Sequence, residues 1–163
     1  MNIQHLEMMR VMMERVAAGS WEPVSGYLGN LIQNVPREVQ FDLSDWIDPA
    51  SSCGFSACAV GHACLDEEFR KLGWEWSFWD TPRYKNAGGW FAVRKFFDIG
   101  SYTDELLFQN IYYQYELIDG NFVKQEYHTV KPKEVADRIS ELMELGEESF
   151  KEKYKQLIRK LRD

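Results

Sequence analysis

The segment from Tyr112 to His128 limits the choice of fold more than any other part of the sequence. Two runs rich in β-favouring residues, YYQYELI and NFVKQEYH, flank the dipeptide Asp119-Gly120. Asp-Gly readily adopts the positive φ angles of a two-residue type I′ turn, whose twist matches that of paired strands. The sequence therefore predicts a β-hairpin near 112–128, which excludes an all-helical fold.

Most of the remaining sequence has the period of amphipathic helices. Helices are predicted at 3–18, 23–33, 89–98, 103–108, 134–145 and 147–163. The alternation in WEWSFW predicts a strand at 74–79, and the polar run at 80–89 predicts a loop. We therefore expect a single α+β domain over 1–163, mostly helical, with one small antiparallel sheet formed by the hairpin and 74–79. A peripheral position for the 147–163 helix is left open.

Charge and composition narrow the range of possible partners and locations. The 26 acidic and 19 basic side chains give a net charge of −7, which disfavours nucleic acid as a partner because phosphate contacts need Lys and Arg. No run approaches the ~20 apolar residues of a membrane span, and the N-terminal segment does not have the pattern of a secretory signal. Three cysteines without an export signal are typical of reduced thiols. We expect a cytoplasmic protein with no membrane partner.

All three cysteines lie in the run SSCGFSACAVGHAC, residues 51–64. We predict a helix over 52–64 with Ser51 or Ser52 as its N-cap. Small residues on one face would let a second helix approach closely: Gly54, Ala57, Cys58 and Gly61. Glycine costs a helix about 1 kcal/mol relative to alanine, and close packing would offset that cost. The run is therefore predicted to be the central helix, packed by the amphipathic helices.

Two chemical interpretations of the same run remain as alternatives. On a helix, Cys58 and His62 share one face and could supply two metal ligands, but the three thiols cannot meet at one tetrahedral zinc. Cys53, just after the predicted cap, would have its pKa lowered by the helix dipole, as a nucleophilic thiol requires. His128 is then the candidate base, with Asp42 or Asp45 as the group that orients it. The sequence alone brings none of these residues together, so no metal and no cofactor is expected.

The run also resembles a motif of small uncharacterised phage and bacterial proteins. Their pattern, Cys-Gly-Thr-x-Ala-Cys-x-x-Gly-(Trp/His)-Ala after a short segment that ends in Trp, corresponds here to FDLSDWI followed by CGFSACAVGHA, with Phe55 in place of Thr. Weaker matches follow in AVRKFFDI, ELLF and VADRISELMELG, so the resemblance covers residues 41–146 with gaps. The resemblance implies a small phage accessory protein that acts in the bacterial cytoplasm, and it implies no particular activity.

An aromatic and basic cluster lies between residues 74 and 94. Aromatic faces stack on bases, neighbouring Arg and Lys hold phosphate, and the same residue types are frequent in protein-binding hot spots. The candidate binding residues are Trp74, Trp76, Trp79, Arg83, Tyr84, Lys85, Trp90 and Arg94. The alternative is that the aromatic residues belong to the core and the basic ones are solvated.

These patterns favour a binding protein without catalytic activity. Its expected partner is a host protein or a small nucleotide-like ligand that the protein sequesters, and homodimerisation is left open. The alternative is a cysteine-dependent hydrolase or transferase that uses Cys53 and His128.

Overall fold

The computed structural model describes residues 1–24, 38–51, 54–77, 81–125 and 128–162. The helices are α1 (Ile3–Ala17), α2 (Ala59–Leu65), α3 (Glu67–Lys71), α4 (Trp90–Phe97), α5 (Thr103–Phe108), α6 (Pro132–Leu145) and α7 (Glu147–Lys160), with a 3-10 turn at Asn110–Tyr113. The strands are β1 (Gln40–Phe41), β2 (Ile47–Ser51), β3 (Gly54–Ala57), β4 (Trp74–Trp76), β5 (Pro82–Tyr84), β6 (Ala87–Gly88), β7 (Tyr115–Ile118) and β8 (Asn121–Lys124). The mostly helical α+β class is confirmed, whereas the predicted 23–33 helix lies largely outside the described residues.

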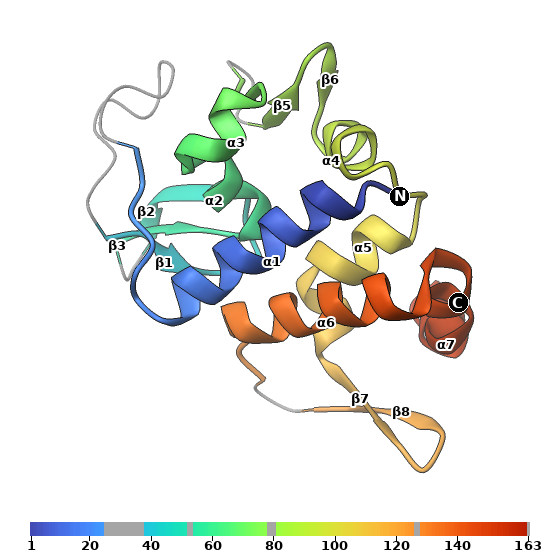
Figure 1. The fold of residues 1–163 in the computed structure, drawn as a ribbon. Coiled ribbons are helices and arrows are strands. Elements are labelled where there is room, and N and C mark those ends of the chain that lie inside the picture. Colours follow the sequence, from blue (N-terminus) through green and yellow to red (C-terminus); the bar gives the residue numbers. More distant parts are fainter. Residues whose placement is uncertain (25–37, 52–53, 78–80, 126–127, 163) are drawn as a thin grey trace.

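The strands form three small sheets around the helices (Figure 1). The first has the order β1-β3-β2, with β1 parallel and β2 antiparallel to β3. The second is the antiparallel sheet β4-β5-β6, and the third is the hairpin β7-β8. The prediction that the hairpin and residues 74–79 share one sheet is therefore wrong, because each finds its partner strand locally.

The predicted hairpin itself is confirmed. Tyr115 pairs with Lys124 and Ile118 with Asn121, which leaves two residues in the turn. Asp119 and Gly120 have φ angles of 49° and 77°, as the type I′ turn requires. Tyr112 and Tyr113, the first two residues of the predicted β run, instead belong to the 3-10 turn at Asn110–Tyr113 and are buried.

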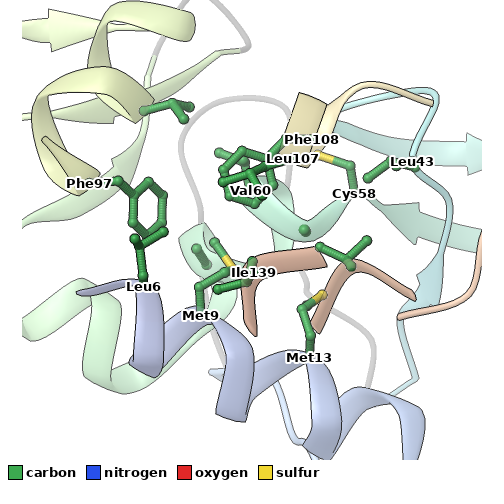
Figure 2. Packing of buried hydrophobic residues seen from close by; sticks show 14 of the residues in the cluster. Leu6, Met9, Met13, Leu43, Cys58, Val60, Phe97, Leu107, Phe108 and Ile139 are labelled. Carbon is green, nitrogen blue, oxygen red and sulfur yellow. The ribbon is translucent and has the colours of Figure 1, made fainter. Parts of the chain in front are cut away.

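The core is built around α1 and α6, which lie side by side (Figure 1). Leu6, Met9 and Met13 of α1 are fully buried together with Ile139 of α6 (Figure 2). Burial of such a side chain stabilises the fold by about 1.5–3 kcal/mol. The methionine-rich face of α1 is thus core, as its spacing predicts. The last helix also contributes to this core through Phe150 and Leu157, both fully buried.

The predicted 52–64 helix is wrong at its start. Residues 54–57 form the middle strand of the first sheet, and Ala57 pairs with Ile47. The helix begins only at Ala59, because Cys58 is extended and its Sγ accepts a hydrogen bond from the backbone N–H of Gly61 at 3.4 Å. Every residue of α2 is nevertheless buried, so its central position is confirmed.

Gly61 allows a close approach, but the neighbour is not a helix. A Cβ at this position would lie 1.8 Å from the carbonyl oxygen of Trp46, in the segment before β2. The backbone N–H of Cys58 donates to the carbonyls of Asp45 and Trp46 at 3.0 and 3.2 Å. The start of α2 therefore fixes the position of Trp46.

The predicted loop at 80–89 is also wrong in part. Pro82–Tyr84 pairs with Trp74–Trp76, and Ala87–Gly88 pairs in turn with β5. Lys85 has a φ of 54°, which closes the tight turn between β5 and β6. Two glycines and a proline, which are unfavourable inside strands, make these short strands difficult to predict from the sequence.

Candidate functional site

The aromatic and basic residues of the 74–94 region do not share one surface. Trp74 is 1% exposed and Tyr84 8%. Their rings lie 5.3 and 4.9 Å from the ring of Phe96 in α4. These two candidates are therefore part of the hydrophobic core.

The other described candidates of the second sheet have different surroundings. Trp76 is partly buried against the core, and Trp79 lies outside the described residues. Arg83 lies 3.6 Å from the Glu75 carboxylate and donates to the carbonyl of Lys85. The Lys85 ammonium lies 5.0 Å from the centre of the Tyr84 ring. Both basic residues are exposed and have partners within the sheet.

The Arg94 guanidinium binds a buried carboxylate. Its Nε donates to Oδ2 of Asp104 at 2.6 Å, and the Asp104 side chain is fully buried. Burial raises the pKa of Asp104, and the hydrogen bond from Arg94 opposes this effect. Arg94 therefore stabilises a charge inside the protein. Among the candidates that the structure describes, Trp90 is the one that lines an open cleft.

We call this feature the tryptophan cleft. It has a volume of about 380 Å³. Its lining residues are Leu43, Ser44, Asp45, Trp46, Cys58, Trp90, Phe108, Gln109, Asn110 and Ile111. They come from the β1–β2 connection, the N-cap of α2, the start of α4, and the segment from the end of α5 into the 3-10 turn.

Trp46 and Trp90 pair at this cleft. Their ring centroids are 4.6 Å apart and their planes are tilted by 51°. Neither indole is fully buried, although both pack against the core. The buried lining residues are Leu43, Cys58 and Phe108, all of which belong to the hydrophobic cluster drawn in Figure 2.

Hydrogen bonds hold the walls of the cleft in place. Asn110 Nδ2 donates to Ser44 Oγ at 3.1 Å and so joins the 3-10 turn to the β1–β2 connection. Gln114 Nε2 donates to Asn110 Oδ1 at 2.9 Å. Together with the bonds from Cys58 to the 45–46 backbone, these contacts preorganise the site.

The cleft has a negative side chain and no positive one among its described lining residues. The Asp45 side chain is exposed, and within the described part of the chain it has no hydrogen-bond or ion-pair partner. The carboxylate of Asp42, just outside the cleft, accepts a hydrogen bond from the backbone N–H of Ser44 at 2.9 Å. The cleft therefore combines aromatic faces with one available carboxylate.

The cysteines that the structure describes are thiols. Cys58 and Cys64 are free and buried. Burial raises the pKa of Cys58 to about 12, and the nearby charge of Asp45 adds to this effect. Burial raises the pKa of Cys64 as well. Neither sulfur has the low pKa of a catalytic thiolate.

His62 is a core histidine. Its Nδ1–H donates to the carbonyl of Cys58 at 2.9 Å, and its ring lies 4.6 Å from that of Trp21. Burial lowers its pKa to about 4, against the opposing effect of the Cys58 carbonyl. Within the described residues no group of three or more His, Cys, Asp and Glu side chains could hold a metal ion. Cys58 and His62 therefore have no further ligands there.

His128 does not line the tryptophan cleft. Its Nε2–H donates to Glu134 Oε1 at 2.8 Å, so its carboxylate partner is neither Asp42 nor Asp45. His128 and Asp42 do line one further cleft of about 380 Å³. Cys53 lies outside the described residues, so the Cys53–His128 pairing stays a prediction.

Comparison of the chain with protein-family models, curated proteins and solved structures gave no match. The resemblance to phage and bacterial proteins therefore stays a prediction. In the part of the chain that the structure describes, no helix is both long and apolar enough to span a membrane.

Most of the tryptophan cleft is not predicted by the sequence. Trp90 is a predicted binding residue, whereas Trp46 belongs only to a motif, and no pattern indicates Gln109 or Asn110 as site residues. The useful signal was Gly61, because a glycine in a buried helix indicates a close neighbour. That neighbour is the backbone of Trp46.

Proposed function

We propose that the protein is a non-enzymatic binding protein, and that the tryptophan cleft is where it docks a partner protein. In this proposal it is a phage accessory factor that binds a protein of the bacterial host in the cytoplasm. The proposal rests on one observation, the pairing of Trp46 with Trp90 at the wall of an open, preorganised cleft.

The surroundings of this pair support a role in binding. Tryptophan is among the residues that contribute most energy to protein interfaces, above all when it lies in a preformed pocket. Ile111, 45% exposed, lies at the same cleft and extends the apolar surface. Two indoles and an exposed isoleucine give a partner both a pocket and a rim.

A protein partner fits the cleft better than a nucleotide. A phosphate group would lie near the Asp45 carboxylate, and none of the described lining residues is Lys or Arg. Like charges in a partly desolvated cleft repel each other. We therefore favour the host protein over the nucleotide-like ligand as the partner.

The enzymatic alternative depends on Cys53, because the thiols of Cys58 and Cys64 have raised pKa values. It requires a reactive thiolate paired with His128. Alkylation of Cys53 followed between pH 5 and 9 tests it. Slow alkylation that rises only near the pKa of an ordinary thiol, about 8.5, would rule out the activated nucleophile.

The binding proposal is tested by affinity capture from a bacterial lysate with the wild type, Trp46→Ala, Trp90→Ala and Phe91→Ala. Phe91 is the matched control, because it is an aromatic residue of the same helix, is 71% exposed and does not line the cleft. We expect one protein whose capture falls about tenfold or more in both tryptophan variants and is unchanged in Phe91→Ala.

Equal capture by all four proteins would contradict the proposal. Loss in Phe91→Ala alone would place the docking surface on another side of α4. Circular dichroism of each variant confirms that it is folded.

A further inference from the structure

We infer that the tryptophan cleft receives an arginine side chain of the partner protein. This inference rests on the proposed function and specifies its chemistry. It combines three observations: Trp46 and Trp90 form an aromatic pair, the Asp45 carboxylate has no partner among the described residues, and the neighbouring basic residues are bound to other groups.

The aromatic pair offers faces on which a cation can lie. A guanidinium within about 6 Å of an indole centre is attracted by the electrons of the ring, and tryptophan is the best of the aromatic residues for this contact. This chain already uses such contacts internally, since the Arg138 guanidinium lies 3.6 Å from the centre of the Tyr113 ring. At the tryptophan cleft the two indoles are tilted by 51° and remain partly open to solvent.

The carboxylate of Asp45 supplies the opposite charge at the same cleft. Some acidic side chains elsewhere have basic partners, as in Glu7 with Arg10 and Glu141 with Lys153. Asp45 has no such partner among the described residues, and its side chain is exposed at a site whose other lining side chains are uncharged. A cation brought by another protein would neutralise it.

The basic residues that the structure describes near this part of the fold are engaged elsewhere. Arg94, one turn along α4 from Trp90, binds the buried Asp104 carboxylate. Arg83 lies beside Glu75, and Lys95 is hydrogen-bonded to Asn86. The cation for Asp45 therefore has to come from outside these residues.

Arginine fits this site better than lysine. Its planar guanidinium can stack on an indole and at the same time donate two parallel hydrogen bonds to a carboxylate. The amide oxygen of Gln109, which also lines the cleft, can accept a further N–H. An ammonium group could satisfy the carboxylate but would lose the planar stacking.

The test uses the folded protein and short peptides. Acetyl-Gly-Arg-Gly-amide is titrated against its citrulline and lysine counterparts while the indole N–H resonances are followed by NMR. Citrulline has nearly the shape of arginine without the charge, so it isolates the electrostatic contribution. The buried indole of Trp74 serves as an internal reference.

We expect the resonances of Trp46 and Trp90 to shift at millimolar arginine peptide while Trp74 is unaffected. The citrulline peptide should bind about tenfold more weakly, and lysine should fall between the two. Asp45→Asn should weaken the arginine peptide about fivefold or more. Asp119→Asn, which makes the same charge change at the tip of the hairpin, should not.

Three results would overturn the inference: no shift up to about 50 mM arginine peptide, equal affinity for citrulline, or an unchanged affinity in Asp45→Asn. A stronger shift with ATP than with arginine would overturn it together with the choice of a protein partner. If Trp90→Ala loses the captured partner while Asp45→Asn retains it, the proposed function stands and the arginine assignment fails.

Discussion

Trp74 on one side, and the pair Trp46 and Trp90 on the other, have opposite surroundings in this protein. Trp74 is covered by Tyr84 of β5 and Phe96 of α4 and is 1% exposed. Trp46 and Trp90 touch each other instead and leave part of their surface on an open cleft. The residue type is the same. The difference is that side chains of β5 and α4 cover the Trp74 ring, whereas the rings of Trp46 and Trp90 are covered only in part. The comparison teaches that an aromatic-rich segment can contribute to the core at one end and to a surface site at the other.

The largest effect should come from removing the covered indole. We expect Trp74→Ala to lower the free energy of unfolding by about 3–5 kcal/mol, because it leaves a cavity among Tyr84, Phe96 and the sheet. Trp90→Ala should cost about 1 kcal/mol, since its ring is only partly removed from water. Urea unfolding of both variants measures the difference. Equal losses would break the distinction between the two sets.

A second expected effect concerns His62, which is buried in α2. Burial lowers its pKa to about 4, whereas an exposed histidine has a pKa near 6.5. As the pH falls, His62 therefore takes up a proton at a higher pH in the unfolded state than in the folded state. The stability that depends on neutral His62 is fully present above pH 6.5 and is lost as the pH falls towards 4, by about 3 kcal/mol.

Urea unfolding between pH 7 and 4, in the wild type and in His62→Gln, isolates this contribution from that of the carboxylates. The wild type should lose about 3 kcal/mol more than the variant over this range. Parallel pH profiles would show that His62 is not kept neutral by burial.

A smaller effect is expected at Gly61, which joins the core to the tryptophan cleft. An added Cβ would lie 1.8 Å from the Trp46 carbonyl oxygen, so Gly61→Ala must displace the backbone that carries Trp46. We expect a loss of about 1–3 kcal/mol in the free energy of unfolding and a change in the Trp46 indole resonance.

Gly88→Ala is the matched control for this change. The nearest atom to a Cβ there is 3.8 Å away, so we expect a change within about 0.5 kcal/mol. A stable Gly61→Ala protein with an unshifted Trp46 resonance would contradict the close packing of α2 against this segment.

The parts of the fold that depend on local signals were predictable. The spacing of Leu6, Met9 and Met13 predicts α1, and Asp119-Gly120 predicts the hairpin. The strand at 54–57 was not predictable, because its small residues also suit a helix and its partners lie at 40–41 and 47–51. Pairing with the neighbouring β2 and with the more distant β1 overrides a local helix preference.

The site was less predictable than the fold for the same reason. Trp46 and Trp90 are far apart in the sequence, and their contact depends on where α2 and α4 place them. No periodicity distinguishes Trp90, at the cleft, from Trp74, in the core. Proximity of aromatic residues along the chain therefore suggested one cluster where the structure has two environments.

The most direct test of the account is site-specific photo-crosslinking from the edge of the tryptophan cleft. A benzoylphenylalanine at Ile111, 45% exposed at the cleft, is compared with one at Leu117, 44% exposed on the hairpin. We predict a cross-linked partner protein from Ile111 alone, and its loss when Trp90→Ala is added. Equal cross-linking from both positions, or an adduct that persists in the Trp90→Ala background, would contradict the tryptophan cleft as the docking site.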